Sequence, residues 1–343
     1  MSLFSQRVFW SCLISSPEDR MGSRLPNYFT TARFRSSYFL YFFPLQGAKF
    51  LTLFDRYPKA IDQAIAHAKK TGVFRIVDVG AGPGTASIAL LIYLLEKYQK
   101  QKKFPFTVEL EWIDKNGTIL KDGEAFLKKL LERFSDFYGD ISLKTDTRDW
   151  WNHPKGFNFE ASLVLFGNVL NESPSEPKVF LQGLAPFFKS PQGGGVLMVE
   201  PAFKSASQRL SQIRDELMPH ALWGPCFHQM KCPLAEGRDW CHFSVPVKLP
   251  GKFFKKFSIK LGSVRDWLKF SFVWVAAQSD QKIVPSIAGK DAKFARIVSD
   301  PIKTNHGMEN QVCAPERVVF TATPRHTIYR GDVVEWKWDK DFR

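Results

Sequence analysis

The chain has 343 residues, of which 44% are hydrophobic and 24% charged, and its formal net charge is +14. This length allows a large core and favours two domains, and the composition is that of a globular protein rather than a fibrous or disordered one. The longest apolar run, residues 86–95, is about half as long as a bilayer span, so we expect no membrane partner.

The positive charge lies at the two ends of the chain. Residues 1–75 carry a net charge of +7, residues 76–243 carry −1, and residues 244–343 carry +8. A neutral centre between basic ends is typical of a protein whose ends contact a polyanion. The expected partner is therefore a nucleic acid, bound by the flanking segments.

Residues 1–72 are predicted to form a helical, basic N-terminal segment, in which residues 55–70 are the clearest helix. The first sixteen residues contain arginine and serine but no acid. That composition is also typical of a weak mitochondrial presequence, although we favour an ordinary first segment. Without a hydrophobic signal core, we expect no secretion.

Residues 73–220 alternate between apolar runs typical of buried strands and longer stretches typical of helices. Strands separated by helices of this length predict βαβ units, and hence an α/β fold with a doubly wound, mostly parallel sheet. The expected strands are residues 74–80, 106–114, 141–145, 161–167 and 195–201, and the expected helices are residues 85–103 and 117–134.

A glycine-rich loop joins the first of these strands to the first helix. Gly80, Gly82 and Gly84 follow one another at alternate positions, and Asp78 precedes them. Glycines let the backbone approach a ligand closely. The dinucleotide pattern has a different spacing, and an acid beside the loop would repel a pyrophosphate, so we favour the amino-acid end of S-adenosylmethionine over NAD. The loop resembles motif I of the class I methyltransferases, and that resemblance runs from about residue 74 to 220.

Other polar residues follow the next strands. Asp114 ends the second strand, where it is placed to accept hydrogen bonds from ribose hydroxyls, and Asp146 follows the third strand, where it can meet the adenine amine. Asn168, with Asn171 and Glu172, comes after the fourth strand at the expected mouth of the cofactor site. We interpret Asp78, Gly80, Gly82, Gly84, Asp114, Asp146 and Asn168 as cofactor-binding residues.

No catalytic residue can be identified in the segment after the fourth strand. It reads LFGNVLNES, whereas amino methyltransferases that act on bases usually have Asn or Asp, two prolines and an aromatic residue there. It also lacks the cysteine that methylation of cytosine C5 requires. The chain is thus either an enzyme with unusual residues or a methyltransferase fold kept as a scaffold, and its enzymatic activity stays open.

Three of the five cysteines, Cys226, Cys232 and Cys241, lie within sixteen residues. An odd number of cysteines without a secretory signal favours a reducing compartment, where clustered cysteines bind metal more often than they form disulfides. Their spacing is wider than that of typical structural zinc sites, and Cys313 is available as a fourth ligand. A [4Fe–4S] cluster suits this spacing better than zinc does, and both remain candidates beside three buried free thiols.

The segments PCFH, KCPL and DWCHFS, which follow VEP and a helix containing IRDEL, resemble the methyltransferase-like iron–sulfur proteins of the mitochondrial small ribosomal subunit and their bacterial relatives. The resemblance covers about residues 30–340. It implies a Rossmann-like methyltransferase core, an iron–sulfur site at Cys226, Cys232, Cys241 and Cys313, and a role in small-subunit assembly or translation. Phe227 stands where the family usually has a proline, and the arginine-rich stretch that usually follows is absent.

These observations combine into one leading hypothesis. Residues 73–220 form an S-adenosylmethionine-binding domain, and residues 221–343 form a small, metal-bound, β-rich and basic C-terminal region. The protein binds small-subunit ribosomal RNA or the pre-ribosomal small subunit as an assembly or translation factor with a structural [4Fe–4S] cluster, and is monomeric off the ribosome. The alternatives are an active ribosomal RNA methyltransferase with structural zinc and a small-molecule methyltransferase. The expected compartment is a bacterial cytoplasm, with the mitochondrial matrix as the alternative.

Overall fold

The computed structural model describes residues 29, 31–137, 139–151, 160–172, 176–190, 194–217, 220, 222–228, 230–246, 256, 259, 267–277, 293–314, 317–322 and 328–336. The first sixteen residues and almost all of the lysine- and phenylalanine-rich stretch 248–262 lie outside these ranges. Among the helices that are described, none is long and apolar enough to cross a membrane.

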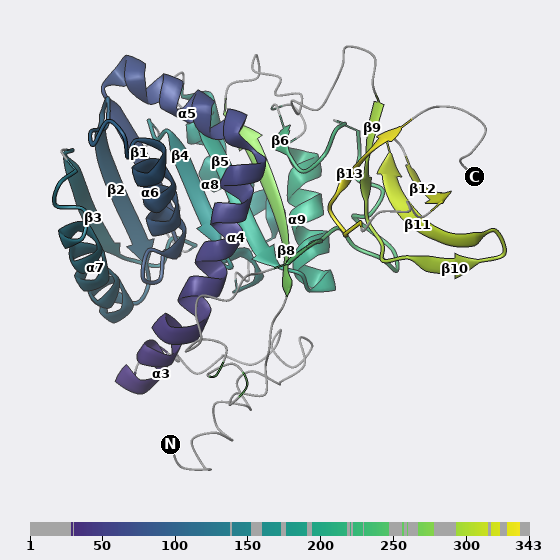
Figure 1. The fold of residues 1–343 in the computed structure, drawn as a ribbon, viewed down its shortest axis with the longest axis horizontal. Coiled ribbons are helices and arrows are strands. Elements are labelled where there is room, and N and C mark those ends of the chain that lie inside the picture. The colour runs from purple at the N-terminus through teal and green to yellow at the C-terminus, as the bar shows by residue number, and fades with distance from the viewer. Residues whose placement is uncertain are drawn as a thin grey trace.

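An eight-stranded sheet forms the centre of the molecule (Figure 1). Its first five strands in chain order run parallel in the order β3-β2-β1-β4-β5, after which β8 pairs antiparallel with β5, and β6 and β7 pair antiparallel with β8. The strands are β1 (Val73–Val79), β2 (Thr107–Asp114), β3 (Ile141–Thr147), β4 (Leu163–Gly167), β5 (Gly195–Pro201), β6 (Leu222–Gly224), β7 (Phe243–Pro246) and β8 (Trp267–Ala276). The mostly parallel α/β sheet confirms the sequence prediction.

Helices cover both faces of this sheet, because β1, β4 and β5 are apolar on both sides. One core layer joins the sheet to α4 (Phe43–Arg56), α5 (Pro58–Thr71), α6 (Thr85–Lys97) and α7 (Gly117–Glu132). The other layer joins it to α8 (Pro177–Lys189) and α9 (Lys204–Glu216). The domain therefore has three layers, and its ligand edge is formed by the loops at the carboxyl ends of the parallel strands.

The described part of the N-terminal segment is helical throughout. The short helix α3 (Ala32–Ser37) continues through a π-helix, η2 (Tyr38–Phe42), into α4. The helix expected at residues 55–70 begins instead at Pro58, after a break at Tyr57. Proline favours this first helical position because its ring sets φ and it lacks the N–H that would stay unpaired there.

A second, five-stranded sheet follows the main one along the chain and has a small apolar core that includes Ile297 and Val312. All of its described pairings are antiparallel, which agrees with the β-rich end expected from the sequence. Its strands are β9 (Lys293–Ile297), β10 (Ile302–Thr304), β11 (Gly307–Ala314), β12 (Arg317–Ala322) and β13 (Val333–Trp336).

The main sheet takes three of its strands, β6, β7 and β8, from beyond residue 220. The long strand β8 inserts between β5 and β6, although the sequence pattern after residue 220 predicted no strand of this domain. Its partner β5 precedes it by more than 60 residues, so no local pattern indicates the pairing. The predicted division into residues 1–72, 73–220 and 221–343 stays a prediction, and the core of the sheet extends across both of its boundaries.

Candidate cofactor site and cysteine cluster

The glycine loop lies where the order of the sheet reverses. Strand β1 pairs with β2 on one side and with β4 on the other, so the connections leaving β1 and β4 diverge. In open α/β sheets, ligands bind at such a switch point, outside the carboxyl ends of the strands. Gly80 follows β1 and Asn168 follows β4, which places both predicted cofactor residues at this edge.

The three glycines of the loop have different structural reasons for being glycine. All have positive φ, of 66° at Gly80, 54° at Gly82 and 73° at Gly84. A Cβ on Gly80 would lie 2.3 Å from Val169 Cγ2, and one on Gly84 would lie 2.1 Å from Trp112 Cζ2. A Cβ on Gly82 would meet nothing within 4 Å. The open side of the loop is therefore at Gly82, where a ligand can approach the backbone.

Asp114 holds this loop in place. One oxygen of its carboxylate accepts a hydrogen bond from Gly82 N at 2.8 Å and the other accepts one from Asn116 N at 2.8 Å. Burial raises the pKa of Asp114, while these two N–H groups oppose the shift. The end of β2 is thereby tied to the turn that follows β1. The predicted contact with a ribose is a further role for the same carboxylate and stays a prediction.

Asp78 is buried beneath the loop. Its Oδ2 accepts hydrogen bonds from Ser87 N at 3.0 Å and Ser87 Oγ at 2.9 Å, so it joins β1 to the first turn of α6. Burial raises the pKa of Asp78 to about 7. This carboxyl accepts from both the backbone and the side chain of Ser87, and its predicted interaction with an ammonium group stays a prediction.

The structure places Asp146 and Asn168 on two different sides of the switch point. Asp146, near the end of β3, forms an ion pair with Arg148 at 2.8 Å. Asn168 has a left-handed backbone with φ of 56°, and its N–H donates to Val199 O at 2.8 Å. The Asn168 Oδ1 atom is buried and has no hydrogen-bond partner among the described residues. Its acceptor capacity is thus available to a ligand.

Glu200 is a site residue that the sequence reasoning missed. It is fully buried at the end of β5, where Oε1 accepts from Val169 N at 2.9 Å and Leu170 N at 2.8 Å, and Oε2 accepts from Asn171 N at 3.2 Å. Burial raises its pKa to about 7. Glu200 therefore shapes the loop that carries Asn168. Its only signal in the sequence was a single acid at the end of an apolar strand.

The cysteines come from two separate segments, the connection between β6 and β7 and strand β11. Cys226 follows β6, Cys232 and Cys241 lie in the loop before β7, and Cys313 lies on β11 of the second sheet. Cys232 belongs to a small buried cluster with Leu234 and Val298, and the partly buried Cys241 and Cys313 pack against this cluster. Burial raises the pKa of each of these three thiols, and the nearby Cys226 raises it further.

No group of three or more His, Cys, Asp or Glu side chains in the described ranges is arranged to hold a single metal ion. The four cysteines therefore lie near one another without forming such a group.

Three arginines hold the segments around these thiols. Arg214 donates to His228 O at 2.6 Å and to Met230 O, and pairs with Asp215, whose carboxylate accepts from Cys232 N at 2.9 Å. Arg296 donates to Pro225 O at 2.8 Å and to Gly331 O at 2.6 Å. Their side chains are nearly inaccessible to solvent, so their positive charge acts through protein rather than water.

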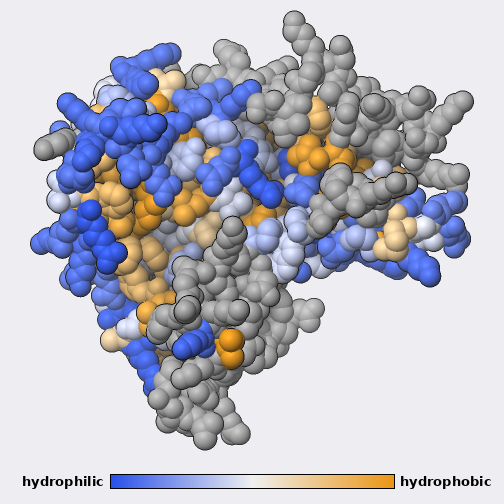
Figure 2. All heavy atoms as spheres, in the orientation of Figure 1, coloured by the Kyte–Doolittle hydropathy of each residue, from blue (hydrophilic) through white to orange (hydrophobic). Residues whose placement is uncertain are grey.

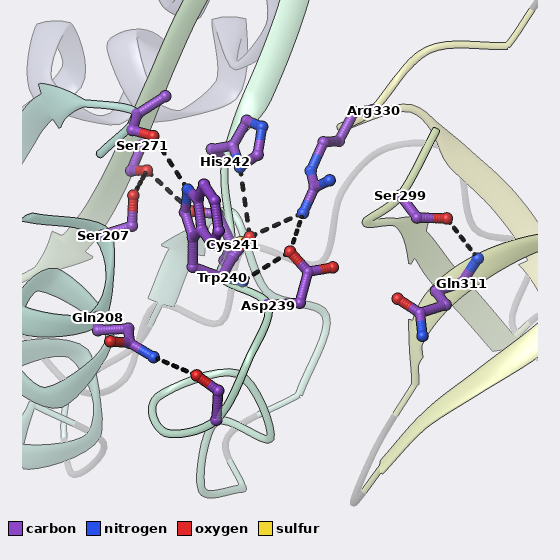
Figure 3. Close-up of polar contacts among 12 residues, drawn as sticks. Ser207, Gln208, Asp239, Trp240, Cys241, His242, Ser271, Ser299, Gln311 and Arg330 are labelled. Carbon is purple, nitrogen blue, oxygen red and sulfur yellow. Dashed lines mark hydrogen bonds and ion pairs between the residues drawn. The ribbon is translucent and has the colours of Figure 1, made fainter. Parts of the chain in front are cut away.

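Figure 3 shows how the third arginine, Arg330, reaches the loop before β7: it donates to Asp239 at 2.7 Å and to Trp240 O at 2.9 Å. On the opposite side, Ser271 of β8 donates to Cys241 O at 2.8 Å and lies 2.6 Å from the Ser207 hydroxyl of α9. The loop that carries Cys241 is therefore fixed to both sheets.

The strand order and the glycine loop at its switch point define a Rossmann-like α/β protein of the methyltransferase type. More particularly, the chain belongs to the family described as mitochondrial small ribosomal subunit Rsm22, whose family model matches residues 59–333. No curated protein matches the chain.

Several solved structures are similar over parts of the chain. An O-methyltransferase family protein from Burkholderia thailandensis is 12% identical over 81% of this chain and 70% of its own, with a TM-score of 0.33. A SAM-dependent methyltransferase from Aquifex aeolicus is 10% identical over 68% of this chain and 98% of its own, with a TM-score of 0.32. MNMC2 from Aquifex aeolicus is 23% identical over 46% of this chain, with a TM-score of 0.29, and this chain spans about half (51%) of its length.

Proposed function

We propose that this protein is an assembly or translation factor that binds small-subunit ribosomal RNA, carries S-adenosylmethionine at its glycine loop and holds a structural [4Fe–4S] cluster on Cys226, Cys232, Cys241 and Cys313. The observation that carries the proposal is the convergence of these four cysteines in a chain of a small-ribosomal-subunit family. The family description supports the mitochondrial matrix over the bacterial cytoplasm that the sequence favoured.

The donor set suits an iron–sulfur cluster. Four thiols are near one another and have no disulfide among them, and ionising all of them in a buried place requires compensating positive charge. Arg214, Arg296 and Arg330 supply such charge around the loop. Thiolates that bind a single zinc lie roughly 4 Å apart, whereas the cysteine sulfurs that bind a cube of four irons lie farther from one another. When bound, a cluster would link the connection between β6 and β7 to strand β11.

The cofactor site suits a methyl donor that has no phosphate. The open backbone at Gly82 and the carboxylates of Asp78 and Asp114 lie together at the switch point. In this proposal Asp114 accepts from the ribose, Asp146 meets the adenine, and Gly80, Gly84 and Asn168 shape the rest of the site. The unpaired Asn168 Oδ1 favours an active ribosomal RNA methyltransferase as a second candidate, because a buried amide oxygen can orient an acceptor.

The first experiment measures iron, acid-labile sulfide and zinc in protein purified without oxygen. We expect about four irons and four sulfides per chain, unchanged in Cys12→Ser and lost in Cys232→Ser. One zinc without sulfide would overturn the cluster assignment and leave the zinc-containing alternative.

A second experiment separates an RNA-binding factor from a small-molecule methyltransferase. Binding to small-subunit ribosomal RNA should weaken steeply between 50 and 200 mM salt, by a factor on the order of 10³ if about six phosphates are contacted. Affinity that does not depend on salt would contradict the RNA role. If the wild type transfers methyl groups to immature small subunits and Gly82→Arg does not, the protein is an enzyme. Equal transfer by the wild type and by Gly82→Arg would exclude this site from the chemistry.

A further inference from the structure

The side chain of His228 reaches the sulfur of Cys313. Its Nε2 atom lies 3.8 Å from Cys313 Sγ, a distance at which an N–H group can donate to a sulfur atom, which is larger than oxygen. His228 lies in the connection between β6 and β7, two residues after Cys226, whereas Cys313 lies on β11 of the second sheet. The contact therefore joins two segments that are 85 residues apart.

This contact lies where the second sheet meets the main one. Figure 2 shows hydrophobic residues on the side of the second sheet that is turned toward the main sheet, and hydrophilic residues at its outer end. Cys313 packs there against the buried cluster that contains Cys232, Leu234 and Val298. Both His228 and Cys313 are partly buried, so the surrounding protein limits the access of water to the hydrogen bond.

The other ring nitrogen of His228 determines which atom carries the proton. Met230 N lies 3.3 Å from His228 Nδ1, and a backbone N–H group can only donate. Arg214 Nη2, which also can only donate, lies 3.5 Å from the same atom. Nδ1 is therefore the acceptor, and a neutral imidazole whose Nδ1 accepts carries its proton on Nε2. The Nε2–H group then donates to Cys313 Sγ.

Arg214 fixes the turn that carries His228. Its side chain is 1% exposed, and it pairs with Asp215 at 2.6 Å. It donates to His228 O at 2.6 Å and to Met230 O, while Asp215 accepts from Cys232 N at 2.9 Å. The arginine that holds the backbone of His228 is thus linked through one carboxylate to the backbone of a neighbouring cysteine.

The same tautomer argues against His228 as a metal ligand. A histidine that binds a metal through one nitrogen almost always donates a proton from the other. Nδ1 of His228 faces two donors, so it does not carry such a proton while these contacts hold. Arg296 lies opposite Cys313 in the pairing of β9 with β11, but its donors bond to two carbonyl oxygens and one hydroxyl elsewhere. His228 is therefore placed as a hydrogen-bond donor beside the four cysteines.

We infer that His228 is a positioning residue that donates a hydrogen bond from Nε2 to the sulfur of Cys313 and thereby raises the reduction potential of a cluster held there. The inference rests on the proposed function, because the potential belongs to the proposed cluster. Reduction adds one electron, whose negative charge is shared with the cysteine sulfurs. An N–H group directed at one of these sulfurs stabilises the added charge, so loss of the donor lowers the potential.

The test measures the potential of the full chain purified without oxygen, with an electrode that supplies one electron to the oxidised cluster. We expect His228→Phe to lower the equilibrium constant for reduction by a factor on the order of ten, which is about 59 mV for one electron. His228→Gln, whose amide nitrogen can take the place of the ring Nε2, should stay close to the wild type. His228→Asn, whose amide reaches only the position of Nδ1, should resemble His228→Phe.

His306→Phe is the matched control, because His306 is an exposed histidine of the same sheet, in the turn between β10 and β11. It should keep the wild-type potential. Equal potentials in the wild type, His228→Phe and His228→Asn would overturn the inference. Loss of iron in His228→Gln would also overturn it, because it would make His228 a ligand.

Nitrogen NMR of protein that contains isotope-labelled histidine tests the contact without the cluster. The His228 signal, assigned by its absence in His228→Gln, should show the proton on Nε2, and a proton on Nδ1 would contradict the inference. If the wild type contains no iron and sulfide, the cluster of the proposed function fails and the effect on its potential fails with it. The NMR signal then still decides whether His228 donates to Cys313.

Discussion

The guanidinium of Arg296 lies 4.7 Å from the centre of the Phe227 ring. Arg296 belongs to β9 of the second sheet, whereas Phe227 directly follows Cys226 at the edge of the first. The same guanidinium lies 5.3 Å from the centre of the Phe243 ring and also donates to the Tyr57 hydroxyl at 3.2 Å. One side chain thus joins the N-terminal helices, the cysteine loop and both sheets.

We predict that Arg296→Met lowers the free energy of unfolding by about 3 kcal/mol, because Pro225 O and Gly331 O lose charged hydrogen-bond donors in a buried place. Urea denaturation measures the effect. The exposed Arg133 at the end of α7 provides the control, and Arg133→Met should stay within about 0.5 kcal/mol of the wild type. Similar stabilities for the two variants would show that Arg296 does not hold the sheets together.

Two glycine substitutions should separate folding from ligand binding. Gly84→Ala places a Cβ 2.1 Å from the buried Trp112 ring and should destabilise the fold by about 3 kcal/mol. Gly82→Ala meets no protein atom within 4 Å, so only its left-handed backbone opposes it, by about 1 kcal/mol. Thermal unfolding with and without S-adenosylmethionine checks both. We expect Gly82→Ala to fold and to lose most of the stabilisation by the ligand; full stabilisation would mean that the ligand does not approach Gly82.

Glu200 should make stability fall as the pH rises. Its pKa is raised from 4.5 to about 7, so between these values the folded protein binds the proton more tightly than the unfolded chain. The stabilisation is complete below pH 4.5 and is lost as the pH passes about 7. Between pH 5 and pH 8 the wild type should therefore lose about 2 kcal/mol more than Glu200→Gln, which keeps an oxygen for Val169 and Leu170. The exposed Glu96→Gln is the control, and parallel pH profiles for wild type and Glu200→Gln would contradict the assignment.

Loss of one cysteine should loosen the second sheet. Cys313 is 72 residues from Cys241, and closing a loop of this length removes about 4 kcal/mol of unfolded-state entropy in the chain-entropy account. Cys232→Ser should therefore speed limited proteolysis within residues 222–336, with β6 and β8 affected and β1 to β5 protected. Cys12→Ser should match the wild type. Unchanged protease resistance together with lost metal would show that the proposed cluster is not structural.

Local sequence patterns were sufficient to predict the parallel strands of the main sheet and the helices between them. Apolar strands such as Val73–Val79 end at a glycine, and amphipathic helices such as Gly117–Glu132 follow them, because burial on one or both faces of an element imposes its period on the sequence. The glycine loop was predicted for the same reason: positive φ at alternate positions excludes other residues at low energy.

Contacts between segments far apart in the chain could not be predicted from local sequence patterns. Strand β8 pairs with β5 across more than 60 residues, and Tyr38 lies beside Thr85 just after α3, which the Arg35–Asp122 ion pair joins to α7. Glu200 is an ordinary acid in sequence, and its role depends on three N–H groups about thirty residues away. These contacts are caused by packing in three dimensions, which produces no periodic pattern in the sequence.

The sequence by itself determined the α/β class, the place of the glycine loop and the cysteines worth considering, because each depends on residue types at short spacing. Only the tertiary structure decided that Cys313 lies near Cys226, Cys232 and Cys241, that β6, β7 and β8 complete the main sheet, and that Arg296 connects the two sheets. The physical reason is that a buried strand or a buried charge needs a partner in space, and that partner can come from any part of the chain, however distant in sequence.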